Sequence, residues 1–142
     1  MRNKHFYICA AIAIACLAGT ATAAEHTKDS LDTVKANLAK KKAVIIDVRE
    51  PAEWKRGHLA AAQLVPLSQL KRLASDDAAK QKLEKSLPKD VIVYCHCGSG
   101  VRVLPAADIL GKLGYDIRPL AAGFDDLREA GFPVAKPVPA GK

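Results

Sequence analysis

The chain has 142 residues, a length at which a single domain is expected. Its hydrophobic share of 49% and charged share of 26% are typical of a globular protein, and an aromatic share of 5% predicts an aliphatic core. The formal net charge is +7, but the Lys and Arg residues are scattered and no aromatic residues lie among them, which argues against a nucleic-acid-binding surface.

The first 23 residues have the pattern of a cleavable secretory signal peptide. A basic start precedes an apolar run at residues 6–18, and the small residues 21–23 form a cleavage signature, so that we expect cleavage after Ala23. The apolar run is shorter than the ~20 residues of a membrane span, and no stable membrane insertion is expected after cleavage. We therefore expect an exported protein, either periplasmic or secreted.

Cleavage would leave 20 basic and 15 acidic residues, a net charge of +5, which mildly favours small anionic partners. It would also remove Cys9 and Cys16, so that Cys95 and Cys97 remain as the two cysteines of the exported chain. A Cys-x-Cys disulfide closes a very small loop and strains the bond, and no second half of a metal site matches these cysteines. Chemistry at a thiol explains the pair better than a disulfide staple or a metal centre.

We expect three regions after the signal peptide. Residues 24–43 form a lead-in whose first six residues are frayed and whose helix is capped by Ser30, with Lys residues at its end. Residues 44–134 form the main domain, and residues 135–142 form a flexible tail.

Residues 44–48 are an apolar run typical of a strand that is buried on both faces, as in a parallel sheet covered by helices. Asp47 interrupts this run, and a buried carboxylate needs a partner, for which Arg49 is the nearest candidate. We expect both residues to give structural support at the strand end rather than to act in catalysis. After a short helix at residues 50–56, His58 is expected to tie loop backbone together.

Strands and helices alternate through the remainder of the chain. The predicted elements are a strand at 64–65, helices at 67–73 and 76–87, a strand at 91–94, a helix at 103–113, a strand at 115–120 and a helix at 125–130. This alternation predicts an α/β fold, a mostly parallel central sheet with helices on both faces.

The loop that follows the strand at 91–94 is the candidate site. It holds both cysteines, His96, two glycines and a serine before Arg102, and a helix follows. A strand that ends in a Gly-rich turn and leads into a helix N-terminus gathers backbone N–H groups around one point, which favours an anion. A cysteine at such a point is poised as a thiolate. His96 either tunes this loop or faces solvent.

Several motifs in the right order resemble a single-domain rhodanese, a sulfurtransferase family. They are Asp47-Val48-Arg49-Glu50-Pro51, Glu53-Trp54, Gly57-His58-Leu59, Val65-Pro66, the loop, Gly123-Phe124 and Ala130-Gly131-Phe132-Pro133-Val134. The resemblance implies the rhodanese-like fold, with the active-site loop at the carboxyl end of a central parallel strand. It also implies a small anionic sulfur donor, a thiophilic acceptor and no cofactor, while it indicates no particular oligomeric state.

The loop pattern of that family, Cys-x-x-Gly-x-Arg, selects one of the two cysteines. Counting from Cys97 to Arg102 fits every defined position, whereas counting from Cys95 puts the arginine two residues late. We assign Cys97 as the nucleophile and keep Cys95 as the runner-up nucleophile or as a resolving thiol. Cysteine phosphatases place five residues between Cys and Arg, a spacing that neither cysteine offers.

The resemblance implies that Cys97 accepts the outer sulfur of thiosulfate or a similar donor as a persulfide and passes it to cyanide or a thiol. Arg102 would hold the donor's sulfonate oxygens, and four residues would line the cradle: Gly98, Ser99, Gly100 and Val101. The alternative is a non-catalytic sulfur carrier, redox sensor or binding module that uses the Cys95/Cys97 pair.

Overall fold

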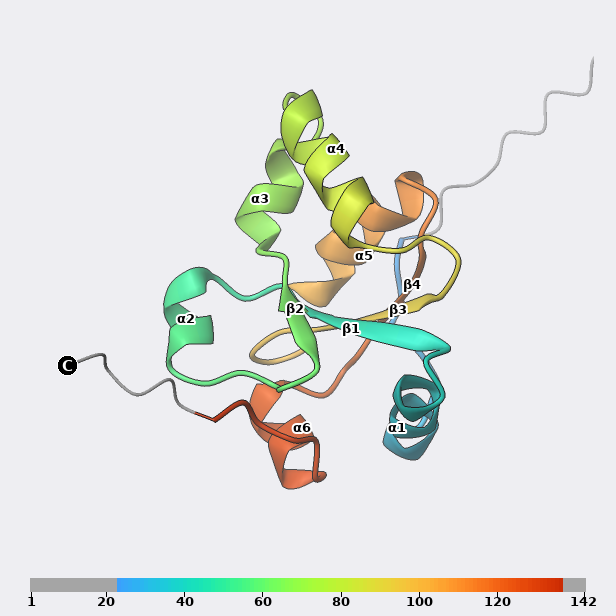
Figure 1. Cartoon of the computed structure of the whole chain (residues 1–142), viewed down its shortest axis with the longest axis vertical. Helices are drawn as coiled ribbons and strands as arrows, with labels where there is room; N and C mark the ends of the chain where they lie inside the picture. The colour runs from blue at the N-terminus through green and yellow to red at the C-terminus, as the bar shows by residue number, and fades with distance from the viewer. Residues whose placement is uncertain (1–22, 137–142) are drawn as a thin grey trace, which may run out of the picture.

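A computed structural model describes residues 23–136, so that the predicted signal peptide, apart from Ala23, lies outside the described residues, as does most of the predicted tail. Within that range four parallel strands form one sheet in the order β2-β1-β3-β4 (Figure 1). The strands are β1 (Ala43–Asp47), β2 (Ala62–Leu64), β3 (Ile92–His96) and β4 (Asp116–Pro119). The predicted parallel sheet is confirmed.

Helices cover both faces of this sheet (Figure 1). One face packs against α1 (Leu31–Ala39) and α6 (Phe124–Glu129), and the other packs against α3 (Leu67–Arg72), α4 (Asp77–Ser86) and α5 (Val103–Lys112). The short α2 (Pro51–Lys55) follows β1. No helix among the described residues has the length and apolar character that a membrane span requires.

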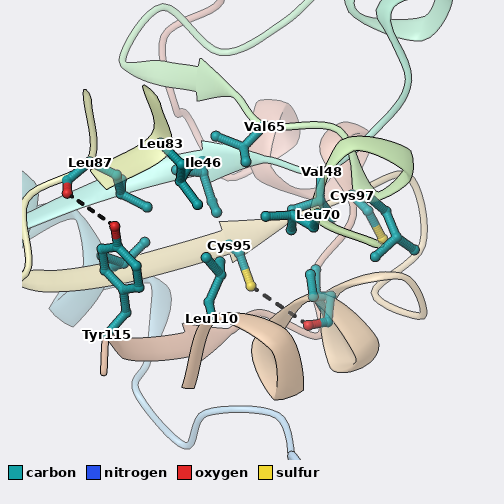
Figure 2. Packing of buried hydrophobic residues seen from close by; sticks show 14 of the residues in the cluster. Ile46, Val48, Val65, Leu70, Leu83, Leu87, Cys95, Cys97, Leu110 and Tyr115 are labelled. Carbon is teal, nitrogen blue, oxygen red and sulfur yellow. Dashed lines mark hydrogen bonds between the residues drawn. The ribbon is translucent and has the colours of Figure 1, made fainter. Parts of the chain in front are cut away.

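Two aliphatic cores result from the alternation of side chains along the strands. On β3, Val93 and Cys95 point to the side of α3, α4 and α5, whereas Tyr94 points to the side of α1 and α6. Figure 2 shows Cys95 and Cys97 in the first of these cores, beside Leu70 and Leu110. Full burial of an aliphatic side chain of this kind contributes about 1.5–3 kcal/mol.

Two strands differ from the sequence prediction by two residues at one end, and the other two strands differ by one residue at each end. The strand predicted at 64–65 lies at Ala62–Leu64, because these residues pair with Ile45 to Asp47 of β1. The strand predicted to end at residue 94 continues to His96, which pairs with Asp47. In both cases the strand ends where its neighbour stops pairing, a property of the sheet rather than of the local sequence.

The segment 24–29 is not frayed, contrary to the prediction. The Thr27 N–H donates to the Pro119 carbonyl (2.7 Å), and the Ala24 N–H donates to the Asp108 carboxylate (2.9 Å). These partners are more than eighty residues away in the chain, so that tertiary contacts order a segment without local periodicity. It lies at the edge strand β4 and at α5.

Candidate active site

Cys97 lies at the carboxyl end of β3, where the loop to α5 begins. Because β3 occupies the centre of the sheet, this is the edge at which ligands of open parallel sheets bind. The Cys97 side chain is fully buried, and its carbonyl accepts a hydrogen bond from the Phe124 N–H (2.8 Å) at the start of α6. This hydrogen bond therefore joins the start of the loop to the start of α6.

Residues 98–103 present a run of backbone N–H groups next to this thiol. Among the hydrogen bonds of the described residues, none uses an amide of this run as its donor. The N-terminus of α5 adds the positive end of its dipole. Unpaired amides in such a turn can form a concave site for an anion, and in the sequence this run begins directly after Cys97.

Two glycines hold the loop against the connection between β4 and α6. Gly100 is buried and has a φ of 75°, and a Cβ there would collide with the Ala121 carbonyl oxygen. A Cβ on Gly123 would collide with the Gly98 carbonyl oxygen in the same way. The loop and this connection thus meet backbone to backbone, which a side chain at either glycine would prevent.

Arg102 is paired with a residue that the sequence analysis did not select, Glu53 of α2. Arg102 Nη1 and Nη2 donate to the two Glu53 carboxylate oxygens at 2.6 and 2.8 Å. The Arg102 guanidinium lowers the pKa of Glu53 to about 2, and Glu53 in turn is the chief cause of a raised Arg102 pKa, with a smaller contribution from Cys97. The expected grip of Arg102 on donor oxygens stays a prediction, and Glu53 already uses part of the guanidinium.

The sequence signal for Glu53 was ambiguous. Glu53 also accepts the Glu50 N–H (3.1 Å) as the third residue of a capping box, and an acidic residue three positions after a helix start is explained by that role alone. Its partner Arg102 is 49 positions away. The motif Glu53-Trp54 in the resemblance was the only feature that pointed to this position.

Cys95 lies in the hydrophobic core rather than in the loop (Figure 2). Its Sγ points toward α5 and donates a weak hydrogen bond to the Val103 carbonyl (3.8 Å). Burial raises the pKa of the Cys95 thiol far above its usual range, and the neighbouring Cys97 charge adds to the rise. Both cysteines are free. At neutral pH Cys95 is a protonated, packed thiol.

The predicted pair of Asp47 and Arg49 is present. Asp47 Oδ2 accepts from Arg49 Nη2 (2.7 Å) and Oδ1 accepts from the Arg49 N–H (2.9 Å), both residues being buried. The same guanidinium donates to the Gly57 carbonyl (2.8 Å) and stacks 4.2 Å above the ring of Phe124. This pair joins the end of β1 to α2 and α6 beneath the loop.

The two histidines near the site have different surroundings. His96 is fully buried and does not face solvent: Nδ1 lies 3.4 Å from the Cys97 carbonyl, and Nε2 lies 3.7 Å from Asp47 Oδ2 without a hydrogen bond. Burial lowers the pKa of His96. His58 bonds to the Trp54 carbonyl of α2 (3.1 Å) and stacks on the Trp54 ring, and the loop-tying role expected for it stays a prediction.

A pocket of about 350 Å³ opens beside the loop at Gly98. Three arginines and two acidic residues give it a polar lining, which consists of Arg49, Glu53, Arg56, Gly57, Gly98, Phe124, Asp125 and Arg128. A more apolar pocket of about 370 Å³, lined by residues that include Leu38, Leu59 and Phe132, has no cysteine in its wall. The polar pocket is the one adjacent to the candidate chemistry.

The chain is similar in sequence to known proteins. The family model described as Rhodanese-like domain matches residues 30–130. The uncharacterized protein YqhL of Bacillus subtilis is 40% identical over 85 residues, which cover 59% of this chain and 60% of YqhL. A putative mitochondrial thiosulfate sulfurtransferase of Schizosaccharomyces pombe is 39% identical over 80 residues, which cover 53% of this chain and 55% of that protein.

Solved structures agree with the family match. The human single-domain sulfurtransferase TSTD1 superimposes with a TM-score of 0.58 and 29% identity, covering 70% of this chain and 92% of that chain. The two curated relatives are matched over less than two thirds of their own length. Sulfurtransferases are thus among the proteins that this chain resembles.

Proposed function

Because the chain belongs to the rhodanese-like domain family, we propose that it is a sulfurtransferase that carries a sulfane sulfur on Cys97. The observation that carries the proposal is the position of the Cys97 thiol at the start of the unpaired amides of residues 98–103, beside Arg102. Such donors stabilise a thiolate and also the terminal sulfur of a persulfide, which is anionic as well.

The proposed reaction has two displacement steps. The Cys97 thiolate attacks the outer sulfur of thiosulfate, a new S–S bond forms, the bond to the sulfonate sulfur breaks, and the electron pair leaves with sulfite. Cyanide or a thiolate then attacks the terminal sulfur of the persulfide, and the Cys97 thiolate is released. The first step requires no general acid, since sulfite is a good leaving group near neutral pH, and the second step returns Cys97 to the form that began the cycle.

The Cys97 side chain is fully buried in the structure. Entry of a donor therefore requires a shift of the loop or of the Arg102–Glu53 pair. The polar pocket at Gly98 supports an anionic donor, since Arg56 and Arg128 line its mouth. Arg102 would stabilise charge on the sulfur while Glu53 holds its guanidinium in place.

A second candidate is the non-catalytic carrier, redox sensor or binding module that uses Cys95 and Cys97. Full burial of both thiols favours the binding module among these, since a carrier or sensor thiol must be reached by its reactant just as a catalytic nucleophile must be reached by its substrate. The raised pKa of Cys95 argues against a redox pair, because a protonated core thiol attacks a disulfide or sulfenic acid slowly.

The test is sulfur transfer from thiosulfate to cyanide by the purified chain from Ala24 onward, which contains every helix and strand of the structure. We expect Cys97→Ser to abolish transfer, Cys95→Ser to retain most of it, and Arg102→Ala to lower it at least tenfold. Unchanged activity in Cys97→Ser would exclude the proposed nucleophile.

We further propose that the protein acts after export. Fractionation of cells that express the full chain tests this proposal.

A further inference from the structure

The Cys97 loop has a contact with the start of the described chain that the proposed reaction does not use. Gly100 lies in the middle of the loop with its backbone buried, and a buried carbonyl needs a hydrogen-bond partner. His26 supplies one, with Nε2 at 2.7 Å from the Gly100 carbonyl oxygen. Because a carbonyl oxygen only accepts, the Nε2 atom of His26 carries the proton.

The segment around His26, residues 24–29, is called the N-terminal strap from here on. Its last residue, Asp29, is fixed by two donors: the carboxylate accepts from the Tyr94 hydroxyl (2.6 Å) and from Arg118 Nη1 (2.9 Å). The backbone bonds to β4 and to α5, described with the fold, fix the remainder of the strap. The backbone on both sides of His26 is therefore anchored, and the contact of its exposed side chain with the loop is the bond to Gly100.

Gly100 is enclosed from two directions. Its Cα faces the Ala121 carbonyl so closely that no Cβ fits, and its own carbonyl is bonded to His26. A peptide plane held at both of these points has its orientation defined, and the amides before and after it in the chain are oriented with it. These amides belong to the run at residues 98–103.

We propose that His26 is a positioning residue for the Cys97 loop, and that its bond to the Gly100 carbonyl holds the amides of residues 98–103 in the arrangement that binds an anionic sulfur. The expected effect of His26 on turnover rests on the proposed function, whereas its expected effect on the order of the loop does not. His26 touches neither the sulfur nor the substrate and acts through Gly100.

The size of the effect follows from the strength of one hydrogen bond. Loss of such a bond predicts a fall in kcat/KM of about three- to tenfold. We expect the fall to be mainly in kcat, because the amides stabilise charge that changes on the sulfur during the reaction rather than binding the donor in its ground state.

The experiment compares three variants of the chain from Ala24 onward. His26→Ala removes the donor, His26→Gln retains an N–H donor at a similar reach, and Glu25→Ala is the control at an exposed neighbour in the same strap. We expect His26→Ala to lower kcat, His26→Gln to restore most of it, and Glu25→Ala to have no effect. We also expect the 15N order parameters of residues 98–103 to fall in His26→Ala from a rigid value of about 0.85 toward about 0.6.

Equal loop order parameters in His26→Ala and Glu25→Ala would overturn the proposal, as would a His26→Gln variant that behaves like His26→Ala in both measurements. The order parameters can be measured on a protein that catalyses no reaction. They therefore test the positioning role of His26 independently of the proposed sulfur transfer. If the parent protein transfers no sulfur and His26→Ala still loosens the loop, the proposed function fails and the positioning role of His26 stands.

Discussion

Two side chains on either side of the loop set the charge around Cys97. Arg102 contributes a cation from the N-terminus of α5, and Glu53 contributes an anion from α2. The Glu53 carboxylate accepts hydrogen bonds from two N–H groups of Arg102. A bidentate pair of this kind restricts the guanidinium to one plane, which a lysine at the same position would not allow. The pair therefore fixes the orientation of the guanidinium beside the loop.

The Arg102–Glu53 pair makes the stability of the fold depend on pH. Glu53 has a folded-state pKa of about 2, below its ordinary value of 4.5, so that its ionised form stabilises the fold above pH 4.5 and this contribution is lost as the pH falls toward 2. Glu53→Gln, which keeps the capping-box geometry, should reduce the free energy of unfolding by about 1 kcal/mol at pH 7. Urea unfolding at pH 7, 4.5 and 3 measures the difference.

The difference between the parent and Glu53→Gln should shrink between pH 4.5 and pH 3. Glu84→Gln is the matched control, since Glu84 forms an exposed pair with Lys89 on the surface, and it should change stability less. A difference that is constant from pH 7 to pH 3 would contradict the pairing of ionised Glu53 with Arg102.

The two cysteines should differ in reactivity toward iodoacetamide in the native protein at pH 8. Cys97 begins the loop of unpaired amides, where the proposed reaction brings a small reactant to it, whereas Cys95 is a core thiol with a raised pKa. We expect one modification per chain, located at Cys97 by peptide mass analysis, and modification of Cys95 only after addition of urea. Labelling of Cys95 at the rate of Cys97 would show that the core assignment is wrong.

At the scale of elements, the loop is shaped as much by the connection between β4 and α6 as by its own residues. Gly100→Ala should lower the free energy of unfolding by about 2 kcal/mol or more and impair sulfur transfer, because it adds a collision with Ala121 to the strain of a positive φ. Gly114→Ala is the control, since Gly114 also has a positive φ but has free space at its Cβ position. It should lose about 1 kcal/mol without loss of transfer.

Chemical denaturation and the transfer assay on the two alanine variants check this comparison. Equal losses of stability and full activity in both would mean that the approach of Gly100 to Ala121 has no part in shaping the loop.

Helices and strands could be predicted where the sequence pattern within the element determines them. The predictions were wrong where contacts with distant residues determine the structure. The apolar run of β1 and the periodic residues of α1 were sufficient to locate both. The position of β2 was wrong by two residues, because pairing with β1 decides it. The strap was expected to be frayed, because its order comes from partners such as Pro119 and Asp108, which no sequence window contains.

At the scale of the whole molecule, the alternation of strands and helices was sufficient to predict the parallel sheet with helices on both faces. The site was predictable in part: the count from Cys97 to Arg102 selected the cysteine that lies at the carboxyl end of β3, but it did not identify Glu53 or His26. Those two residues belong to α2 and to the strap, and only the folded chain brings them to the loop.

The central claim is that Cys97 carries the transferred sulfur, and the most direct measurement is the mass of the protein after treatment with thiosulfate. We predict that the chain gains the mass of one sulfur atom, that peptide mapping locates it at Cys97, and that cyanide removes it with formation of thiocyanate. Cys97→Ser should gain nothing under the same conditions. A parent protein that gains no sulfur, or that carries it on Cys95, would contradict the account.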